Sequence, residues 1–143
     1  MSEEITYVKV MARVESAAEE IIKANAPFPK ENTVEAWEAY QEALEACLDN
    51  SRDMAWEEVD SWDWMIYTYQ GFQVYDCLWG EDQAQAEQEF WECNEGIKDV
   101  SPYYLGAGIA FFALVSKLTQ EIERQCEEMQ ELAQDKIWQL ERE

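Results

Sequence analysis

The residues best able to do chemistry in this sequence are carboxylates, which recur in pairs three residues apart. Such pairs lie on one face of a helix, where helix bundles use them to hold two metal ions. Those metal sites also need a Glu-x-x-His motif, and the chain contains no histidine. We therefore interpret the pairs as solvated helix faces and expect no bound metal or other cofactor. The pairs are Glu35/Glu38, Glu92/Glu95 and Glu128/Glu131.

The missing histidine also narrows the classes of enzyme. It removes the commonest general base, the commonest zinc ligand and every Ser-His-Asp or Cys-His nucleophile. An all-oxygen calcium or magnesium site stays open, although no D-x-D-x-D-G loop is present. The cysteines form no C-x-x-C pair and lie in helical apolar patterns, which favours buried free thiols in a reducing cytosol. They are Cys47, Cys77, Cys93 and Cys126. We expect a protein that is not an enzyme.

The charge balance sets this chain apart from ordinary globular proteins. Its 143 residues include 32 acidic and 10 basic side chains, for a formal net charge of −22. Duplex DNA carries one charge per roughly 1.7 Å of axis, so this charge corresponds to about 11 base pairs, or about 37 Å of duplex. A compact domain of this size has a diameter of about 37 Å as well. The protein thus carries about as much net charge as DNA of its own length, although surplus carboxylates also keep proteins soluble.

Five acidic residues form a stripe along one predicted helix. They follow steps of three and four residues, opposite the apolar residues Trp37, Tyr40 and Leu44. The glutamates have no Lys or Arg three or four positions onward, and only Asp49 has one, Arg52. The axial separations, about 4.5 and 6 Å, are not far from the phosphate spacing along a strand. We predict a partner-binding surface formed by Glu35, Glu38, Glu42, Glu45 and Asp49.

Two further acidic groups extend the predicted surface beyond the stripe. A solvated helix face is the alternative interpretation for each of them. The first group comprises Glu57, Glu58, Asp60 and Asp63, and the second comprises Glu89, Glu92 and Glu95.

Start and stop signals divide the chain into helical regions. Ser2 can cap a first helix, which should end near Ala26 because two prolines follow. Asn32 then opens a second helix, with Glu35 three residues later in a capping-box pattern. The buried face of this helix is expected to hold Trp37, Tyr40, Leu44, Cys47 and Leu48.

A short polar turn leads to a third helical region, which begins near Asp53. Gly71 is expected to bend this region and Gly80 to end it. A fourth helix, capped by Asp82, should end before Gly96. The apolar series of the third region is Trp56, Val59, Trp62, Met65, Ile66, Tyr69 and Phe72.

Ser101 and Pro102 start the last helix, as a cap followed by proline at the first helical position. Nothing after them breaks a helix, so we expect about 40 residues, or about 60 Å. Gly106 and Gly108 should permit close helix packing. An apolar seam with an eleven-residue repeat packs either on the other helices or on a second copy of the chain. It comprises Val115, Leu118, Ile122, Cys126, Met129, Ala133, Ile137 and Leu140, of which Ile122, Met129, Ile137 and Leu140 are the candidates for oligomerisation.

These regions predict an all-α fold, a bundle of five or six helices with a long C-terminal helix, in a single domain over residues 1–143. The first residues read MSEEITYVKV, with acids where a signal peptide carries bases. The longest apolar run, residues 103–115, is shorter than the roughly 20 residues that cross a bilayer. We expect a cytoplasmic protein.

The size, the acidity and the stripe together resemble the DNA-mimic inhibitors of phages and plasmids, which include anti-restriction and other counter-defence proteins. The resemblance implies a nucleic-acid-binding partner, such as a restriction, CRISPR or other defence nuclease, whose cationic groove accepts carboxylates in place of phosphates. It also implies competitive occlusion, with fast and salt-dependent association, in a bacterial host cytoplasm. The chain itself should not bind nucleic acid, because its bases are scattered and locally outnumbered.

The alternative is a helical adaptor or structural protein that oligomerises through its C-terminal helix. Exposure of the tryptophans separates the two hypotheses, because large open apolar patches mark protein interfaces. An open patch would favour the adaptor, whereas buried rings together with carboxylates clustered on one elongated surface would favour the mimic. The rings in question are Trp56, Trp62, Trp64 and Trp79.

Overall fold

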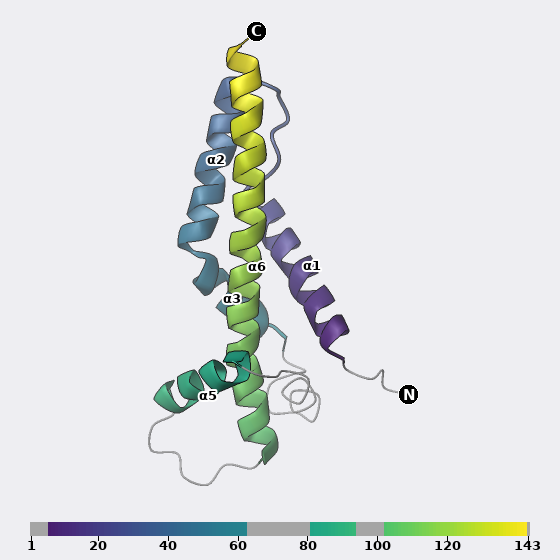
Figure 1. Ribbon diagram of the computed structural model, residues 1–143, viewed down its shortest axis with the longest axis vertical. Coiled ribbons are helices and arrows are strands. Elements are labelled where there is room, and N and C mark those ends of the chain that lie inside the picture. Colours follow the sequence, from purple (N-terminus) through teal and green to yellow (C-terminus); the bar gives the residue numbers. More distant parts are fainter. Residues whose placement is uncertain (1–5, 63–80, 94–101, 143) are drawn as a thin grey trace.

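The long C-terminal helix is the axis of the fold. The computed structural model describes residues 6–62, 81–93 and 102–142, and all regular structure within them is helical. The long helix, α6, runs over 40 residues, Pro102–Glu141 (Figure 1). This confirms the all-α class and the predicted start and length of the last helix. The others are α1 (Tyr7–Asn25), α2 (Val34–Asp49), α3 (Ser51–Asp60) and α5 (Glu81–Cys93).

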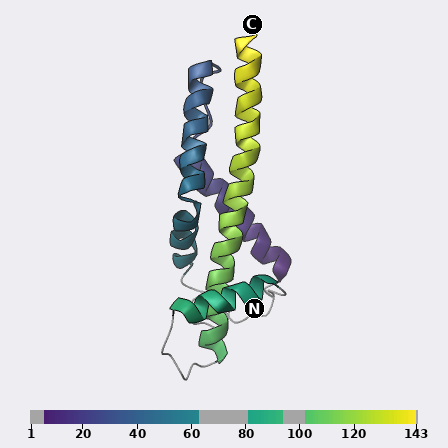
Figure 2. The same cartoon turned by 60° about the vertical axis from the view of Figure 1, so that its left-hand side comes forward.

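Each of the shorter helices packs on α6, and α1 also touches α2 and α3. The helix α2 runs antiparallel beside the C-terminal half of α6, and α1 crosses α6 obliquely (Figures 1 and 2). Near its N-terminal end, α6 is crossed by α5 (Figure 2). Among the described residues, none of the helices combines the length and the apolar character that a membrane crossing needs.

The predicted seam of α6 forms the centre of the core. Val115, Leu118, Ile122, Cys126 and Ala133 are fully buried, and Ile137 is nearly so. Met129 and Leu140 are partly buried against the same core. The predicted inner face of α2 is also confirmed, because four of its members are buried and the fifth is partly buried. These members are Trp37, Tyr40, Leu44 and Cys47, with Leu48 partly buried.

The N-terminal half of α6 packs through aromatic rings. Trp56 of α3 meets Phe111 and Phe112 edge to face, with ring centroids 4.8 and 5.4 Å apart. Phe90 of α5 lies against α6 at Gly108, where a Cβ added to the glycine would overlap the ring. The prediction of close packing is therefore confirmed at Gly108.

The predicted N-terminal caps are wrong by a few residues. The first helix is capped by Thr6, whose Oγ1 accepts from the Lys9 backbone N–H, whereas Ser2 lies outside the described residues. The second is capped by Thr33, whose Oγ1 accepts from the Ala36 N–H at 3.1 Å, not by Asn32. The Asn32 side chain is used elsewhere, because its Oδ1 accepts from the Trp37 indole at 2.8 Å.

The boundaries of the middle helices also differ from the prediction. Only Asn50 separates α2 from α3, so no turn extends to Arg52. The third helix ends at Asp60, and the Trp62 indole then donates to the Glu58 carboxylate at 3.3 Å. Asp82 lies within α5 instead of capping it. The predicted roles of Gly71, Gly80 and Gly96 lie outside the described residues.

Candidate partner-binding surface

The five predicted stripe residues of α2 all point to solvent. Their helix is amphipathic, and burial of its Trp37/Tyr40/Leu44 face leaves the carboxylates on the outside. Within the described parts of the chain, no Lys or Arg forms an ion pair with any of them. The stripe is therefore a row of exposed carboxylates with which no described base pairs. Its members are Glu35, Glu38, Glu42, Glu45 and Asp49.

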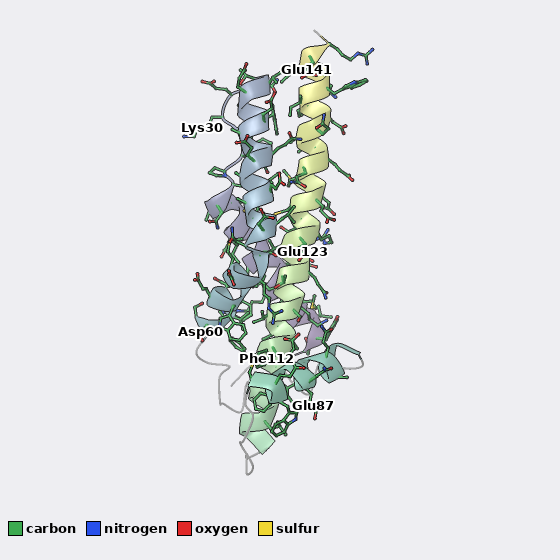
Figure 3. All side chains as sticks on the ribbon, turned by 90° about the vertical axis from the view of Figure 1, so that its left-hand side faces the viewer. Lys30, Asp60, Glu87, Phe112, Glu123 and Glu141 are labelled. Atoms are coloured by element: carbon green, nitrogen blue, oxygen red, sulfur yellow. The ribbon has the colours of Figure 1, made fainter. Side chains whose placement is uncertain are left out.

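Three of the stripe residues, but not Glu35 or Asp49, line a groove of about 650 Å³ between α2 and α6, which we call the acidic groove. Its α6 side adds two carboxylates that the predicted partner-binding surface did not include, Glu127 and Glu131, of which Glu131 had been interpreted as part of a solvated helix face. Across it, Gln41 Nε2 donates to Gln134 Oε1 at 3.2 Å. In Figure 3, α2 and α6 lie side by side, and side chains that end in oxygen atoms project along both helices. No base lines the groove, which is formed by Glu38, Gln41, Glu42 and Glu45 of α2 and by Glu127, Gln130, Glu131 and Gln134 of α6.

The bases whose ion pairs the structure describes lie elsewhere. Lys23 pairs with Glu19 at 2.8 Å. The pairing lowers the pKa of the Glu19 carboxyl and raises the pKa of the Lys23 ammonium, which favours the charged form of both groups. Arg124 pairs with Glu121 and Glu128 within α6. Its guanidinium holds the pKa of the Glu121 carboxyl below its ordinary value. These pairs neutralise carboxylates outside the acidic groove and leave the groove's own charge uncompensated.

The described members of the two further acidic groups do not line the acidic groove. On α3, Glu57 and Asp60 are exposed, whereas Glu58 is partly buried under the Trp62 indole. On α5, Glu92 is exposed, whereas Glu89 is partly buried and pairs with Arg52 of α3 at 3.1 Å. Glu89 therefore joins two helices rather than facing solvent freely. Asp63 and Glu95 lie outside the described residues.

The seam considered for oligomerisation is covered within the chain. Ile122 is fully buried and Ile137 is 5% exposed, while Met129 and Leu140 pack against the same core. Pairing with a second copy through this seam would require the helices packed on α6 to move away. Of the tryptophans, Trp62 is buried and Trp56 is 38% exposed, and Trp64 and Trp79 lie outside the described residues.

The cysteines divide between the core and the surface. Cys47 and Cys126 are buried free thiols, as predicted, and they also contact each other across the α2–α6 interface. Burial raises the pKa of the Cys126 thiol to about 12 and raises that of Cys47 as well. The prediction is wrong for Cys93, the last residue of α5, which is exposed, and Cys77 lies outside the described residues. Among the described side chains, no group of three or more acids or thiols is arranged to hold a metal ion.

Comparisons with protein-family models, with curated proteins and with solved structures found no match to this chain. Fold and surface together describe an acidic, all-helical protein with a row of uncompensated carboxylates on each side of one groove. The charge and the geometry of that groove are therefore the evidence on which a function rests.

Proposed function

We propose that this chain is a nucleic-acid mimic that binds the cationic groove of a nucleic-acid-binding protein, such as a restriction, CRISPR or other defence nuclease, and inhibits it by occlusion. The observation that supports the proposal is the acidic groove. It gathers five carboxylates from two helices far apart in sequence, and no base lies among them. A solvated face on a single helix would not require carboxylates of a second helix to lie beside it. The carboxylates are Glu38, Glu42, Glu45, Glu127 and Glu131.

The two rows of carboxylates have the spacing that a phosphate-binding surface could accept. Along α2, Glu38, Glu42 and Glu45 are separated by about 6 and 4.5 Å of helix rise, and Glu127 and Glu131 on α6 by about 6 Å. The two rows come from neighbouring helices and lie on either side of the acidic groove. Arg and Lys side chains that grip phosphates can bind carboxylates through the same charge-assisted hydrogen bonds.

Like charges held together raise the free energy of the isolated protein, and a cationic partner would relieve that repulsion. With a net charge of −22, the chain would be steered quickly toward a basic groove. Because the attraction is between exposed charges, it should weaken steeply as salt is added. Binding would block nucleic acid without any chemical step, so the protein would not act as an enzyme.

The test is a pull-down with the tagged chain from a bacterial host lysate at low and high salt, followed by mass spectrometry. We expect recovery of a DNA- or RNA-binding protein that high salt releases and added duplex displaces. A salt-resistant partner with no affinity for nucleic acid, or only further copies of this chain, would contradict the proposal.

Variants then locate the surface on the recovered partner. Changing Glu38, Glu42, Glu45, Glu127 and Glu131 to Gln should weaken binding and flatten its salt dependence. The control makes the same change of charge at exposed sites outside the groove and should weaken binding much less. Equal losses in both would show that net charge alone, not the acidic groove, attracts the partner. The control sites are Glu20, Glu31, Glu87, Asp135 and Glu141.

A further inference from the structure

A second groove, of about 610 Å³, lies on the other side of α6, between α6 and α1. We call it the α1–α6 groove. Gln125 and Met129 line it, whereas Glu127 and Glu131 line the acidic groove, and helical geometry places these pairs on opposite sides of buried Cys126. Its floor is apolar, because Ile22 and Tyr40 are almost completely buried beneath it.

The ring of Phe28 lies exposed at one end of this groove and packs on two other aromatic rings. Its side chain is 56% exposed. The ring nevertheless meets Trp37 and Tyr40 edge to face, with centroids 5.2 and 5.6 Å away. A large ring already held in place loses little conformational entropy when a partner covers it. Such pre-ordered aromatic side chains beside apolar pockets are typical anchors of protein interfaces.

The rim of the groove is charged, and its surplus is negative. Both of its bases are already engaged, Lys23 with Glu19 and Arg124 with Glu121 and Glu128. Glu15 is exposed on the same rim, and no ion pair to a described residue neutralises it. Next to Glu15 on the rim, Gln125 Nε2 donates to the Glu15 backbone oxygen at 3.3 Å, and this hydrogen bond links α6 to α1. These features favour an occupant that is apolar toward the floor and basic toward the rim.

We propose that the α1–α6 groove binds a basic amphipathic helix of the partner protein. From Ala12 to Lys23 the groove follows α1 for about 16 Å, which is three turns of helix. Apolar side chains one turn apart on the bound helix would lie on the floor beside Phe28, and flanking Lys or Arg would face Glu15 and the acidic surface. This inference rests on the proposed function and adds to it an apolar anchor, which salt does not screen.

The test uses synthetic helical peptides of about 14 residues as probes, long enough for four turns. One peptide combines Lys with Leu on a single face, and the other has the same charge with Gln in place of Leu. Binding to the full chain is measured by titration calorimetry at low and high salt. We expect the Lys/Leu peptide to bind at least about tenfold tighter and to keep most of that advantage in high salt.

Two variants show where the peptide binds. Ser16 lines the groove and is exposed, so Ser16→Arg places bulk and positive charge in the site without disturbing the core. Ala24 is also exposed on α1 but lies outside the groove, so Ala24→Arg is the matched control. Ser16→Arg should weaken binding of the Lys/Leu peptide about tenfold and Ala24→Arg by less than about twofold. Circular dichroism verifies that both variants keep their helices.

Equal affinity for the two peptides, or equal effects of the two variants, would overturn the inference. Its failure is distinct from failure of the proposed function. A recovered partner that duplex DNA displaces, but that binds Ser16→Arg as tightly as the unchanged chain, would leave mimicry intact and remove the apolar anchor. Specific binding of the Lys/Leu peptide with no nucleic-acid-binding partner would support the groove and contradict mimicry.

Discussion

Position 108 requires a glycine because of a neighbouring side chain, not because of its own backbone conformation. The ring of Phe90, which is 2% exposed, occupies the space where a side chain at position 108 would lie. This lets α5 approach α6 closely. Because the ring is packed in the core, it cannot swing away as a flexible surface side chain could.

Gly108→Ala should destabilise the protein by about 1–2 kcal/mol. Overpacking costs roughly 1–3 kcal/mol, and the better helix propensity of Ala returns roughly 0.5–1 kcal/mol. Urea unfolding measures the change. In a Phe90→Leu background the penalty should shrink, because the ring that the new Cβ meets is gone. An unchanged penalty in that background would place the strain elsewhere.

The buried thiols make stability depend on alkaline pH. Burial raises the pKa of Cys126 from 9.0 to about 12, so between these values the unfolded chain has lost a proton that the native protein keeps. The free energy of unfolding should therefore fall as pH rises from about 9 toward 12, and this contribution is fully present below about 9. Urea melts at pH 7, 9 and 10.5 measure the fall. Cys126→Ala should show a shallower fall, and an equally steep one would assign the effect to other groups.

At the scale of single elements, the start of α2 depends on which of two neighbouring side chains is free to cap it. Asn32 and Thr33 can both cap α2, and either satisfies a free backbone N–H. Asn32 is instead bound to the Trp37 indole, which leaves the cap to Thr33. The indole thereby fixes the entry of the chain into the helix that carries the acidic stripe.

Thr33→Ala should destabilise the protein by about 1 kcal/mol, the usual cost of losing an N-cap oxygen. Thermal unfolding followed by circular dichroism measures it. Thr33→Ser keeps the oxygen and serves as the control, with little expected loss. If Thr33→Ala and Thr33→Ser were equally stable, the cap hydrogen bond would contribute nothing.

At the scale of the whole molecule, the acidic rows oppose folding while the α6 seam stabilises it. Carboxylates at steps of three and four residues repel along α2, and those of α6 face them across the acidic groove. The apolar contact between α2 and α6 must exceed this repulsion. The balance explains how a chain with a net charge of −22 can fold around one long helix.

Added sodium chloride should therefore raise the midpoint of thermal unfolding, because it screens net repulsion. Changing Glu35, Glu38, Glu42 and Glu45 to Gln should stabilise the protein at low salt by roughly 1 kcal/mol, at roughly 0.2–0.5 kcal/mol for each neighbouring pair. This gain should shrink in high salt. A midpoint that falls with salt would mean that favourable ion pairs outweigh the repulsion.

By itself the sequence determined what depends on periodicity within one element. It predicted the helical class, the start and length of α6, the buried seam from Val115 to Ala133 and the exposure of the stripe on α2. These follow because a helix repeats every 3.6 residues, so apolar and charged side chains sort to opposite faces whatever the partner helix is.

The tertiary structure decided everything that depends on which distant elements meet. It assigned the cap of α2 to Thr33, placed Cys93 at the surface, covered Ile122 within the chain and brought Glu127 beside the stripe. The apolar pattern of the seam could be buried equally well by the chain's own helices or by a second copy of the chain. The choice lies in contacts between residues far apart in sequence, which no local spacing encodes.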